Sequence, residues 1–504
     1  MITATHKGKM YDVEYSLVNV LEFEKDLRFG GETYHSEKLN SLLVLNKKAD
    51  NVKVGTCFQL VRNLFDPKNS PPKEVRLLEL ENMGNFEIYD IPKVSSTEFE
   101  STKNIARYGD VVISKLRPYL KQIGFIYLPE VYTSTELLIL RQKHDRNRNL
   151  NYYLYVFLMS KWVQKILFWS QEGTNHPRFP QNVILDCPMP LPSQKFIDVI
   201  EDLIKESFKK KEESEKFFKQ AESLLSEELE LENWKPRAKK IIIGGKKFET
   251  EDNIAIINLS EAIKTSRFDA EYWEPKYIEF EEVIRSYKKS YDYLPNLIEI
   301  SKEKINIDLN DIYNYIELAD INPNLGVVNQ TSQIIGKELP SRARMKVERD
   351  YIIMSSVEGS IDKIALIDFD KENLVASTGF FVFKEKVLNK ETILVLLKLL
   401  AEKYLRREAQ GTILTAIPYN SLKRIILPKV DENIQIQISQ LIQQSLKARE
   451  NSKKLLEVAK KAVEIAIEKN EKEALEYMKQ ETNYSGITVV NKEEGGANNA
   501  SKDT

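Results

Sequence analysis

The chain has 504 residues, of which 42% are hydrophobic. A single core stops growing at roughly 250 to 300 residues, so we expect at least two domains. Charged residues make up 30% of the chain but nearly cancel, to a formal net charge of −2. This balance excludes a globally cationic nucleic-acid binder and leaves only the option of a local basic face.

The cysteines and the N-terminal residues bound the cellular setting. Cys57 and Cys187 lie far apart, form no CxxC motif and have no histidine cluster near them in the sequence, so we expect neither a zinc site nor a disulfide framework. The start, MITATHKGKM, lacks the apolar core of a signal peptide, and no apolar run approaches the roughly 20 residues that span a bilayer. We therefore expect a soluble, cytoplasmic protein with no membrane partner.

A long internal repeat organises the chain, because five short motifs recur in the same order about 240 residues apart. In both copies an Arg-Phe pair stands three residues before a Glu. The matched pairs are Arg28-Phe29 with Arg267-Phe268, Gly109-Asp110 with Arg349-Asp350, Ser134-Thr135 with Ser377-Thr378, Gly173-Thr174 with Gly411-Thr412, and Leu191-Pro192 with Leu427-Pro428. Their nearly constant offset indicates a tandem duplication.

Each copy begins with short apolar or alternating runs that are typical of strands. In the first copy these are residues 110–114, 123–128 and 136–141, and a helix is expected over 151–170. In the second copy they are 351–355, 364–369 and 379–384, followed by a helix over 390–407. Each body is thus predicted to be a mixed α and β domain.

A long helix is expected after each Leu-Pro pair, since residues 194–232 contain neither Gly nor Pro and their apolar residues alternate at spacings of three and four. About 40 residues at about 1.5 Å each give a rod of roughly 60 Å. Lys211 and Ser214 interrupt the first apolar seam, and Ser445 and Ser452 interrupt the second. The seam residues, which are also the candidate partner-binding residues, are Ile197, Ile200, Ile204, Phe218 and Leu225, then Ile438, Leu456 and Val463. We predict that the two helices pair with each other and that this helical region binds a partner protein.

The positive charge belongs to the mixed domains, because residues 101–190 hold 12 Lys and Arg against 6 Asp and Glu, whereas residues 191–235 hold 8 against 12. Residues 331–428 hold 16 against 12. Such segregation suits phosphate binding, although solubility would explain it equally well. Arg, Gln and Asn can read base edges. The candidate DNA contacts are Lys115, Arg117, Lys121, Gln171, Asn175, His176, Arg178, Arg342, Arg344, Lys346, Gln410 and Thr412.

Catalytic motifs are missing from the sequence. The only Pro-Pro, in Ser70-Pro71-Pro72-Lys73, has a lysine where an amine methyltransferase needs a ring to stack on a flipped base. GxGxxG, HExxH and GxSxG are absent, and Gly245-Lys246 has Lys240 where a phosphate-binding loop needs its first glycine. We expect no catalytic residue, no metal and no cofactor in this chain, although abundant acidic residues leave a metal-dependent nuclease formally open.

These elements resemble the specificity subunits of type I restriction-modification enzymes over about residues 11–479. The stretch from Tyr108 to Ser114 carries the resemblance, together with Gly173-Thr174 leading through Pro190-Leu191-Pro192 to a long helix. The second copy, with Gly411-Thr412 and Leu427-Pro428, is weaker upstream and has no counterpart of Arg117-Pro118. That difference leaves the equivalence of the two loops in doubt.

The resemblance implies an α+β protein with two target recognition domains, each followed by a long helix, the two helices pairing as an antiparallel coiled coil. The domains would read the halves of a split site in double-stranded DNA, and the helices would bind two methyltransferase subunits. S-adenosylmethionine and ATP would then belong to the methyltransferase and to motor-nuclease restriction subunits. The expected parts are domains over 1–190 and 266–428, helical spacers over 191–235 and 429–480, a linker and start of the second repeat over 236–265, and a disordered tail over 481–504.

Two other interpretations remain open at this point. One is the specificity part of a related restriction-modification system in which methylation and cleavage domains are fused to it. The other is a scaffold that holds two partner domains apart by a coiled coil and binds no DNA.

Overall fold

The computed structural model describes residues 6–10, 13–17, 33–48, 50–143, 148–232, 234–236, 240–243, 246–249, 255–411 and 415–482. It divides into two compact units. The first unit comprises Met1–Phe208 and Lys453–Thr504, and the second comprises Lys209–Ser452. Both boundaries fall inside the long helices that the sequence predicts.

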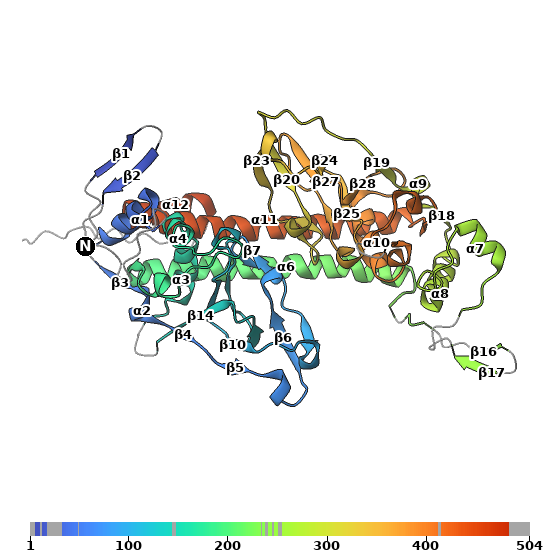
Figure 1. Cartoon of the computed structure of the whole chain (residues 1–504), viewed down its shortest axis with the longest axis horizontal. Helices are drawn as coiled ribbons and strands as arrows, with labels where there is room; N and C mark the ends of the chain where they lie inside the picture. The colour runs from blue at the N-terminus through green and yellow to red at the C-terminus, as the bar shows by residue number, and fades with distance from the viewer. Residues whose placement is uncertain are drawn as a thin grey trace, which may run out of the picture. The chain divides into compact units, whose positions relative to one another are not determined.

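Two sheets form the body of the first unit (Figure 1). The central strand β11 (Val111–Ser114) is buried throughout. Its run of apolar residues is continuous because Val111 and Ile113 enter one core and Val112 enters another. The four-stranded sheet has the order β12 (Ile123–Phe125), β11, β14 (Leu137–Gln142), β4 (Phe58–Val61). The five-stranded sheet has the order β5 (Leu64–Phe65), β10 (Lys103–Arg107), β13 (Glu130–Thr133), β6 (Glu74–Leu78), β9 (Lys93–Ser95).

Two sheets also form the body of the second unit. Its central strand β25 (Ile352–Ser355) is likewise buried at every position. The six-stranded sheet has the order β19 (Glu299–Ser301), β28 (Phe380–Lys384), β25, β26 (Ile364–Leu366), β22 (Val327–Val328), β21 (Ile321–Asn322). The four-stranded sheet has the order β23 (Ser332–Ile335), β20 (Ile312–Ile316), β27 (Leu374–Ser377), β24 (Ala343–Lys346).

The two units share one topology. The order β26-β25-β28-β19 repeats β12-β11-β14-β4, and β24-β27-β20-β23 repeats β10-β13-β6-β9. Even the pairing of β6 with β13, which is parallel, recurs as a parallel pairing of β20 with β27. The predicted tandem duplication of a mixed α and β domain is therefore confirmed, and each copy leads into a long helix.

The repeat differs by one residue from the alignment that the sequence suggests. The amide of Gly109 donates to the carbonyl of Ile126 (2.9 Å), and the amide of Asp350 donates to the carbonyl of Ile367 (2.8 Å). Both residues have positive φ, 87° and 71°. The position of Gly109 is therefore taken by Asp350 and not by Arg349, because Asp tolerates the left-handed region better than most side chains.

The helices that follow β14 and β28 in the chain are shorter than predicted. Instead of one helix over 151–170, the first unit has α3 (Asn151–Met159) and α4 (Lys161–Phe168). Ser160 separates them, because its backbone is extended (φ −62°, ψ 147°) and its amide donates to the carbonyl of Phe157. In the second unit α10 (Lys390–Ala401) ends before a 3₁₀ turn, η10 (Leu405–Glu408), so the helix predicted over 390–407 also has two parts.

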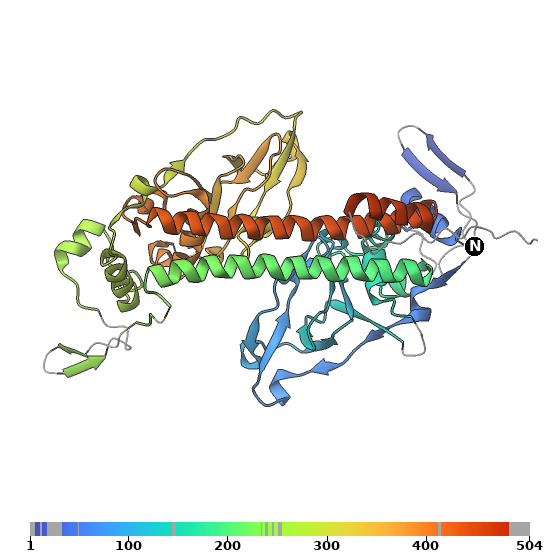
Figure 2. The same cartoon turned by 180° about the vertical axis from the view of Figure 1, so that it is seen from behind.

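Two long helices follow the mixed domains, and Figure 2 shows both as uninterrupted ribbons. They are α6 (Gln194–Glu228) and α11 (Glu432–Glu468), and α11 is followed by α12 (Glu471–Thr482). The core of the first unit holds Ile197, Ile200 and Ile204 together with Leu456 and Val463.

The other halves of the two helices contribute to the second unit. Phe218 and Leu225 of α6 share its core with Ile438 of α11. Inside this unit the predicted interruptions of the seam meet, since the buried Ser445 hydroxyl donates to the carbonyl of Ser214 (2.8 Å). Antiparallel pairing along the whole length of the helices stays a prediction.

The predicted linker and tail contain more structure than expected. The linker includes a hairpin of β16 (Lys240–Ile243) and β17 (Lys246–Glu249), and a similar hairpin, β1 (His6–Met10) with β2 (Val13–Leu17), opens the chain. The helix α12 extends to Thr482, so the first two residues of the predicted disordered tail are helical. The rest of that tail lies outside the described residues.

Three further observations concern only the part of the chain that the structure describes. None of its helices is both long and apolar enough to cross a membrane. No three His, Cys, Asp or Glu side chains in it gather where they could hold a metal ion. Cys57 and Cys187 are both buried as free thiols.

Candidate nucleic-acid interface

The glycine of the Gly-Thr element lies, in both units, beside a pair of backbone hydrogen bonds that closes a loop. In the first unit Glu172 and Arg178 exchange backbone hydrogen bonds of 2.7 and 2.9 Å. In the second unit Gln410 and Ala416 do the same at 2.8 and 2.9 Å. Gly173 (φ 90°) and Gly411 (φ 124°) begin the two loops in a backbone region that favours glycine. We call these segments the first loop (172–178) and the second loop (410–416).

A serine at the end of the central strand directs the chain toward each loop. The hydroxyl of Ser114 accepts a hydrogen bond from the amide of Leu116 (3.1 Å), and Ser355 accepts one from Val357 (3.0 Å). The next residue then binds the loop. The amide of Arg117 donates to Pro177 (2.8 Å) and that of Glu358 donates to Thr415 (2.9 Å). The serine that ends both apolar runs thus fixes where the loop begins.

A basic turn projects beside the first loop. It comprises Arg117, the 3₁₀ turn η5 (Pro118–Leu120) and Lys121, and both basic residues are left-handed, with φ of 48° and 53°. Left-handed non-glycine residues each cost of order 1–3 kcal/mol. The conformation presents Tyr119 to solvent with 49% of its surface exposed. An exposed aromatic ring between two cations suits contact with a nucleic acid.

The structure brings the seven candidates of the first unit to this loop and turn. Arg178 makes two hydrogen bonds of 3.1 Å to Glu136, which lies 3.9 Å from the Lys115 ammonium. The Arg178 hydrogen bonds hold the pKa of Glu136 below its ordinary value. Arg117 Nη2 lies 3.3 Å from His176 Nδ1. Lys121 belongs to the turn itself, Gln171 directly precedes the first loop, and Asn175 is an exposed residue within it.

The candidates of the second unit do not form an equivalent set. Arg342, Arg344 and Lys346 lie in or just before β24, in the other sheet. Lys346 is already paired with Glu348 (2.7 Å). Gln410 begins the second loop, as Gln171 precedes the first, whereas Thr412 lies outside the described residues. The backbone hydrogen bonds that close the two loops are therefore equivalent, but the basic candidates around them are not.

The charge at the equivalent positions is reversed. The strand register and the backbone hydrogen bonds that close the loops define the equivalent positions. Lys115 and Arg117 correspond to Ser356 and Glu358. Lys121 and Arg178 correspond to Asp362 and Ala416. Glu358 in turn accepts a hydrogen bond from Arg406 (2.9 Å). Four cations in the first unit therefore correspond to two carboxylates in the second.

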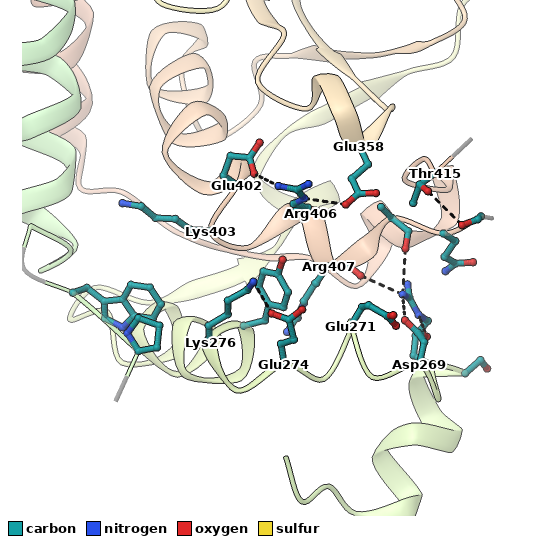
Figure 3. Close-up of a pocket in the computed structure, with 18 residues that line it drawn as sticks. Asp269, Glu271, Glu274, Lys276, Glu358, Glu402, Lys403, Arg406, Arg407 and Thr415 are labelled. Atoms are coloured by element: carbon teal, nitrogen blue, oxygen red, sulfur yellow. Dashed lines mark hydrogen bonds and ion pairs between the residues drawn. The ribbon is translucent and has the colours of Figure 1, made fainter. Parts of the chain in front are cut away.

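A cavity of about 970 Å³ adjoins the second loop (Figure 3). Several of the charged side chains in its walls are paired within the protein. Arg406 bridges Glu358 and Glu402 at 2.9 Å each, and Lys276 contacts Glu274 at 2.5 Å. These two cations are therefore already neutralised by carboxylates, and Arg406 links the wall to Glu358, whose amide binds the second loop.

Arg267, from the Arg-Phe motif of the repeat, lies in this wall with 5% of its surface exposed. Its guanidinium donates to the carbonyl oxygens of Arg407, Glu408 and Ala409 (3.2, 3.3 and 3.3 Å). The Arg-Phe motif is visible in the sequence, but its role is visible only in the folded protein. Glu136 and Tyr119 were missed, since neither belongs to a motif and only folding brings them beside the loop.

The eight seam residues are inside the protein. Ile197, Ile200, Ile204, Leu456 and Val463 belong to the core of the first unit, and Phe218, Leu225 and Ile438 belong to that of the second. A direct contact between these side chains and another subunit is therefore not available. Binding of a partner to the outer faces of the helices stays a prediction.

Neither a protein-family model nor a curated protein matches the sequence. Solved structures of one class, type I restriction-modification proteins, resemble the chain. A chain from a study of the assembly and conformational transition of the type I R-M system is 14% identical, and the match covers 83% of this chain and 97% of that one at a TM-score of 0.30.

Two of the similar structures are single subunits. The HsdS subunit from Thermoanaerobacter tengcongensis is 14% identical, with 83% of this chain and 96% of that one covered and a TM-score of 0.30. The type I S subunit from M. genitalium is 10% identical, with 83% and 94% covered and a TM-score of 0.36. Likeness at this level assigns no role to any residue described above.

Proposed function

We propose that this chain is the specificity subunit of a type I restriction-modification enzyme, which reads a bipartite DNA target and directs methyltransferase and restriction subunits to it. One observation carries the proposal: the same pair of sheets and the same closed loop occur twice, and each copy leads into a long helix. Two copies of one fold with different residues around the loop fit a target with two different halves.

The first loop and the basic turn supply the chemistry for reading DNA. Lys115, Lys121 and Arg117 would contact phosphates, which position the protein without specifying sequence. Gln171 and Asn175 are of the residue types that bind adenine edges, and Tyr119 can contact a base or a sugar. The described residues offer no metal cluster, and in this proposal methylation and cleavage take place on partner subunits.

The outer faces of the long helices would hold the partners. In the second unit, α6 has a shallow groove of about 560 Å³ lined by Glu212, Lys216, Lys219 and Ser223, among others. This mixed-charge surface is separate from the buried seam at Phe218 and Leu225. S-adenosylmethionine would be bound by the methyltransferase subunits that dock there, and ATP by separate motor-nuclease subunits.

Selection from a randomised duplex library by the full-length chain tests the proposal. We expect enrichment of two short sequences at fixed spacing. Exchange of residues 27–190 for the corresponding segment of a related protein should then change one half of the selected and methylated sequence and leave the other half intact. Enrichment of no duplex at low salt would favour the non-DNA scaffold, and a change in both halves would contradict separate reading.

A further inference from the structure

The guanidinium of Arg267 closes the end of a helical turn. It donates to three successive carbonyl oxygens, those of Arg407, Glu408 and Ala409, where η10 ends. The last carbonyls of a helical turn have no partner within it, and a cation placed there satisfies both their hydrogen bonds and their partial negative charge. Arg267 reaches them from a segment about 140 residues earlier in the sequence.

Arg267 is itself firmly held. Its Nε donates to Asp269 (2.6 Å), and Nη2 donates to the second oxygen of the same carboxylate (2.5 Å). These hydrogen bonds hold the pKa of Asp269 below its ordinary value. The ring of Tyr272 lies 4.5 Å from the Arg267 guanidinium and 5.0 Å from that of Arg407. The group is therefore fixed before any ligand arrives.

The second loop begins directly after these carbonyls. Ala409 is followed by Gln410, whose backbone closes the loop onto Ala416. We infer that Arg267 is a positioning residue for the second loop, so that discrimination of one DNA half-site depends on a buried side chain that does not touch DNA. This inference rests on the proposed function.

The first unit holds the corresponding segment with residues of its own, and Arg28, the repeat counterpart of Arg267, lies outside the described residues. His35 stacks on Trp169 with ring centroids 3.5 Å apart, and the Trp169 indole donates to Glu37 (3.0 Å). Trp169 stands two residues before Gln171 and the first loop. Because the two loops have separate supports, a change at Arg267 should affect only one half-site.

The test compares Arg267→Met with Arg449→Met in the full-length chain. Arg449 is also a buried arginine of the second unit, 6% exposed, and its guanidinium donates to the side chain of Asn329. The probe is the duplex that the wild-type chain selects, with either half scrambled in turn. The readout is the ratio of Kd for each scrambled duplex to Kd for the intact one.

For Arg267→Met we expect this ratio to fall about tenfold at one half-site and to stay unchanged at the other, since hydrogen bonds to a charged group are lost only beside the second loop. Hydrogen exchange at the amides of Gln410 and Ala416 should accelerate. Arg449→Met should alter neither quantity even where it lowers stability. Asp269→Asn, which loosens the guanidinium without removing it, should give a smaller loss in the same direction.

Combining Arg267→Met with Gln410→Ala adds a coupling test. If Arg267 acts through the loop, the double variant should lose little more than Gln410→Ala alone. Equal effects of Arg267→Met and Arg449→Met, or loss at both half-sites, would overturn the inference while the proposed function stood. A wild-type chain that selects no duplex would overturn both.

Discussion

Asp110, which directly precedes β11, forms a two-pronged ion pair with Arg141 of β14. Arg141 Nε and Nη2 donate to the two carboxylate oxygens at 2.8 and 2.7 Å, and Asp110 is only 2% exposed. The equivalent residues of the second unit are Tyr351 and Lys384, and the Lys384 ammonium lies 4.6 Å from the Tyr351 ring centre. A cation on one strand thus meets an electron-rich partner on the other in both units, although the chemistry has changed.

Removal of the Asp110 carboxylate should destabilise the first unit. Asp110→Ala leaves the Arg141 guanidinium without its partner, and we expect the free energy of unfolding to fall by about 3 kcal/mol. Tyr351→Phe keeps the ring and should cost less than about 1 kcal/mol. Urea unfolding followed by circular dichroism measures both. Equal, small losses would mean that the ion pair is not needed to join the strands.

The one-residue shift in the repeat predicts different tolerances at neighbouring positions. Asp350→Val puts a β-branched side chain at φ 71° and should cost about 2 kcal/mol. Asp350→Gly should be tolerated, because the equivalent Gly109 adopts the same region. Arg349→Val, an exposed change, should alter stability by less than about 1 kcal/mol. A larger loss at Arg349 than at Asp350 would contradict the register.

The sequence was sufficient for the duplicated architecture, since motif order and alternating apolar runs depend on local pattern. It misaligned Asp110 with Asp350 because two aspartates look alike in sequence, whereas the equivalence is set by backbone hydrogen bonds and positive φ. The break at Ser160 was also missed, since the apolar spacing continues across it. These are properties of backbone conformation that residue type signals only weakly.

The candidate site, like the fold, could be predicted only in part from the sequence. Lys115, Arg117 and Arg178 could be predicted together, because basic residues near strand ends and a Gly-Thr element are visible in the sequence. Glu136 and Arg267 could not, since each reaches its loop across a long sequence separation. The sequence also did not show that Arg344 lies on a strand of the other sheet, so its contact with DNA stays a prediction.

Asp320 should make the second unit sensitive to pH. Burial at 2% exposure raises its pKa from 3.8 to about 6, although hydrogen bonds from the Glu317 amide and Gln330 partly oppose this. An acid whose pKa is raised by folding favours the native state while protonated. Its contribution is therefore fully present below about pH 4 and is lost as the pH rises through 6, by up to about 3 kcal/mol.

Asp320→Asn removes this titration and keeps an oxygen that can accept from Glu317. We expect the difference in unfolding free energy between wild type and variant to change between pH 4 and 6 and to level off above 7, with the variant the more stable there. Urea unfolding at a series of pH values measures the difference. A constant difference would show that Asp320 ionises normally in the fold.

Partner binding should depend on the outer face of α6 and not on the seam. Lys216→Glu with Lys219→Glu changes two exposed residues and should weaken assembly with the methyltransferase subunit at least about tenfold, since rim charges steer and orient association. Lys337→Glu with Lys371→Glu, exposed elsewhere in the second unit, serves as the control.

Leu225→Asp buries an unpaired charge in the core and should unfold the unit, so it cannot report on assembly. Size-exclusion chromatography with light scattering measures the complex, and normal assembly of the α6 variant would place the partner elsewhere.

The reversed charge around the two loops predicts that the domains contribute unequally to salt-dependent affinity. Arg117→Ala and Lys121→Ala each remove a phosphate contact, so each should reduce the slope of log K against log salt by about 0.9. Glu358→Gln, at the position equivalent to Arg117, should not reduce the slope, because it removes a repulsion and no phosphate contact is lost.

Lys161→Ala is the matched control, since this exposed lysine is paired with Glu468 of α11 (2.5 Å) and should leave the slope unchanged. Binding titrations at four or more salt concentrations on the selected duplex measure the slopes. If Arg117→Ala left the slope intact while lowering affinity, the basic turn would read bases and not phosphates, and the electrostatic asymmetry between the two domains would lie elsewhere on their surfaces.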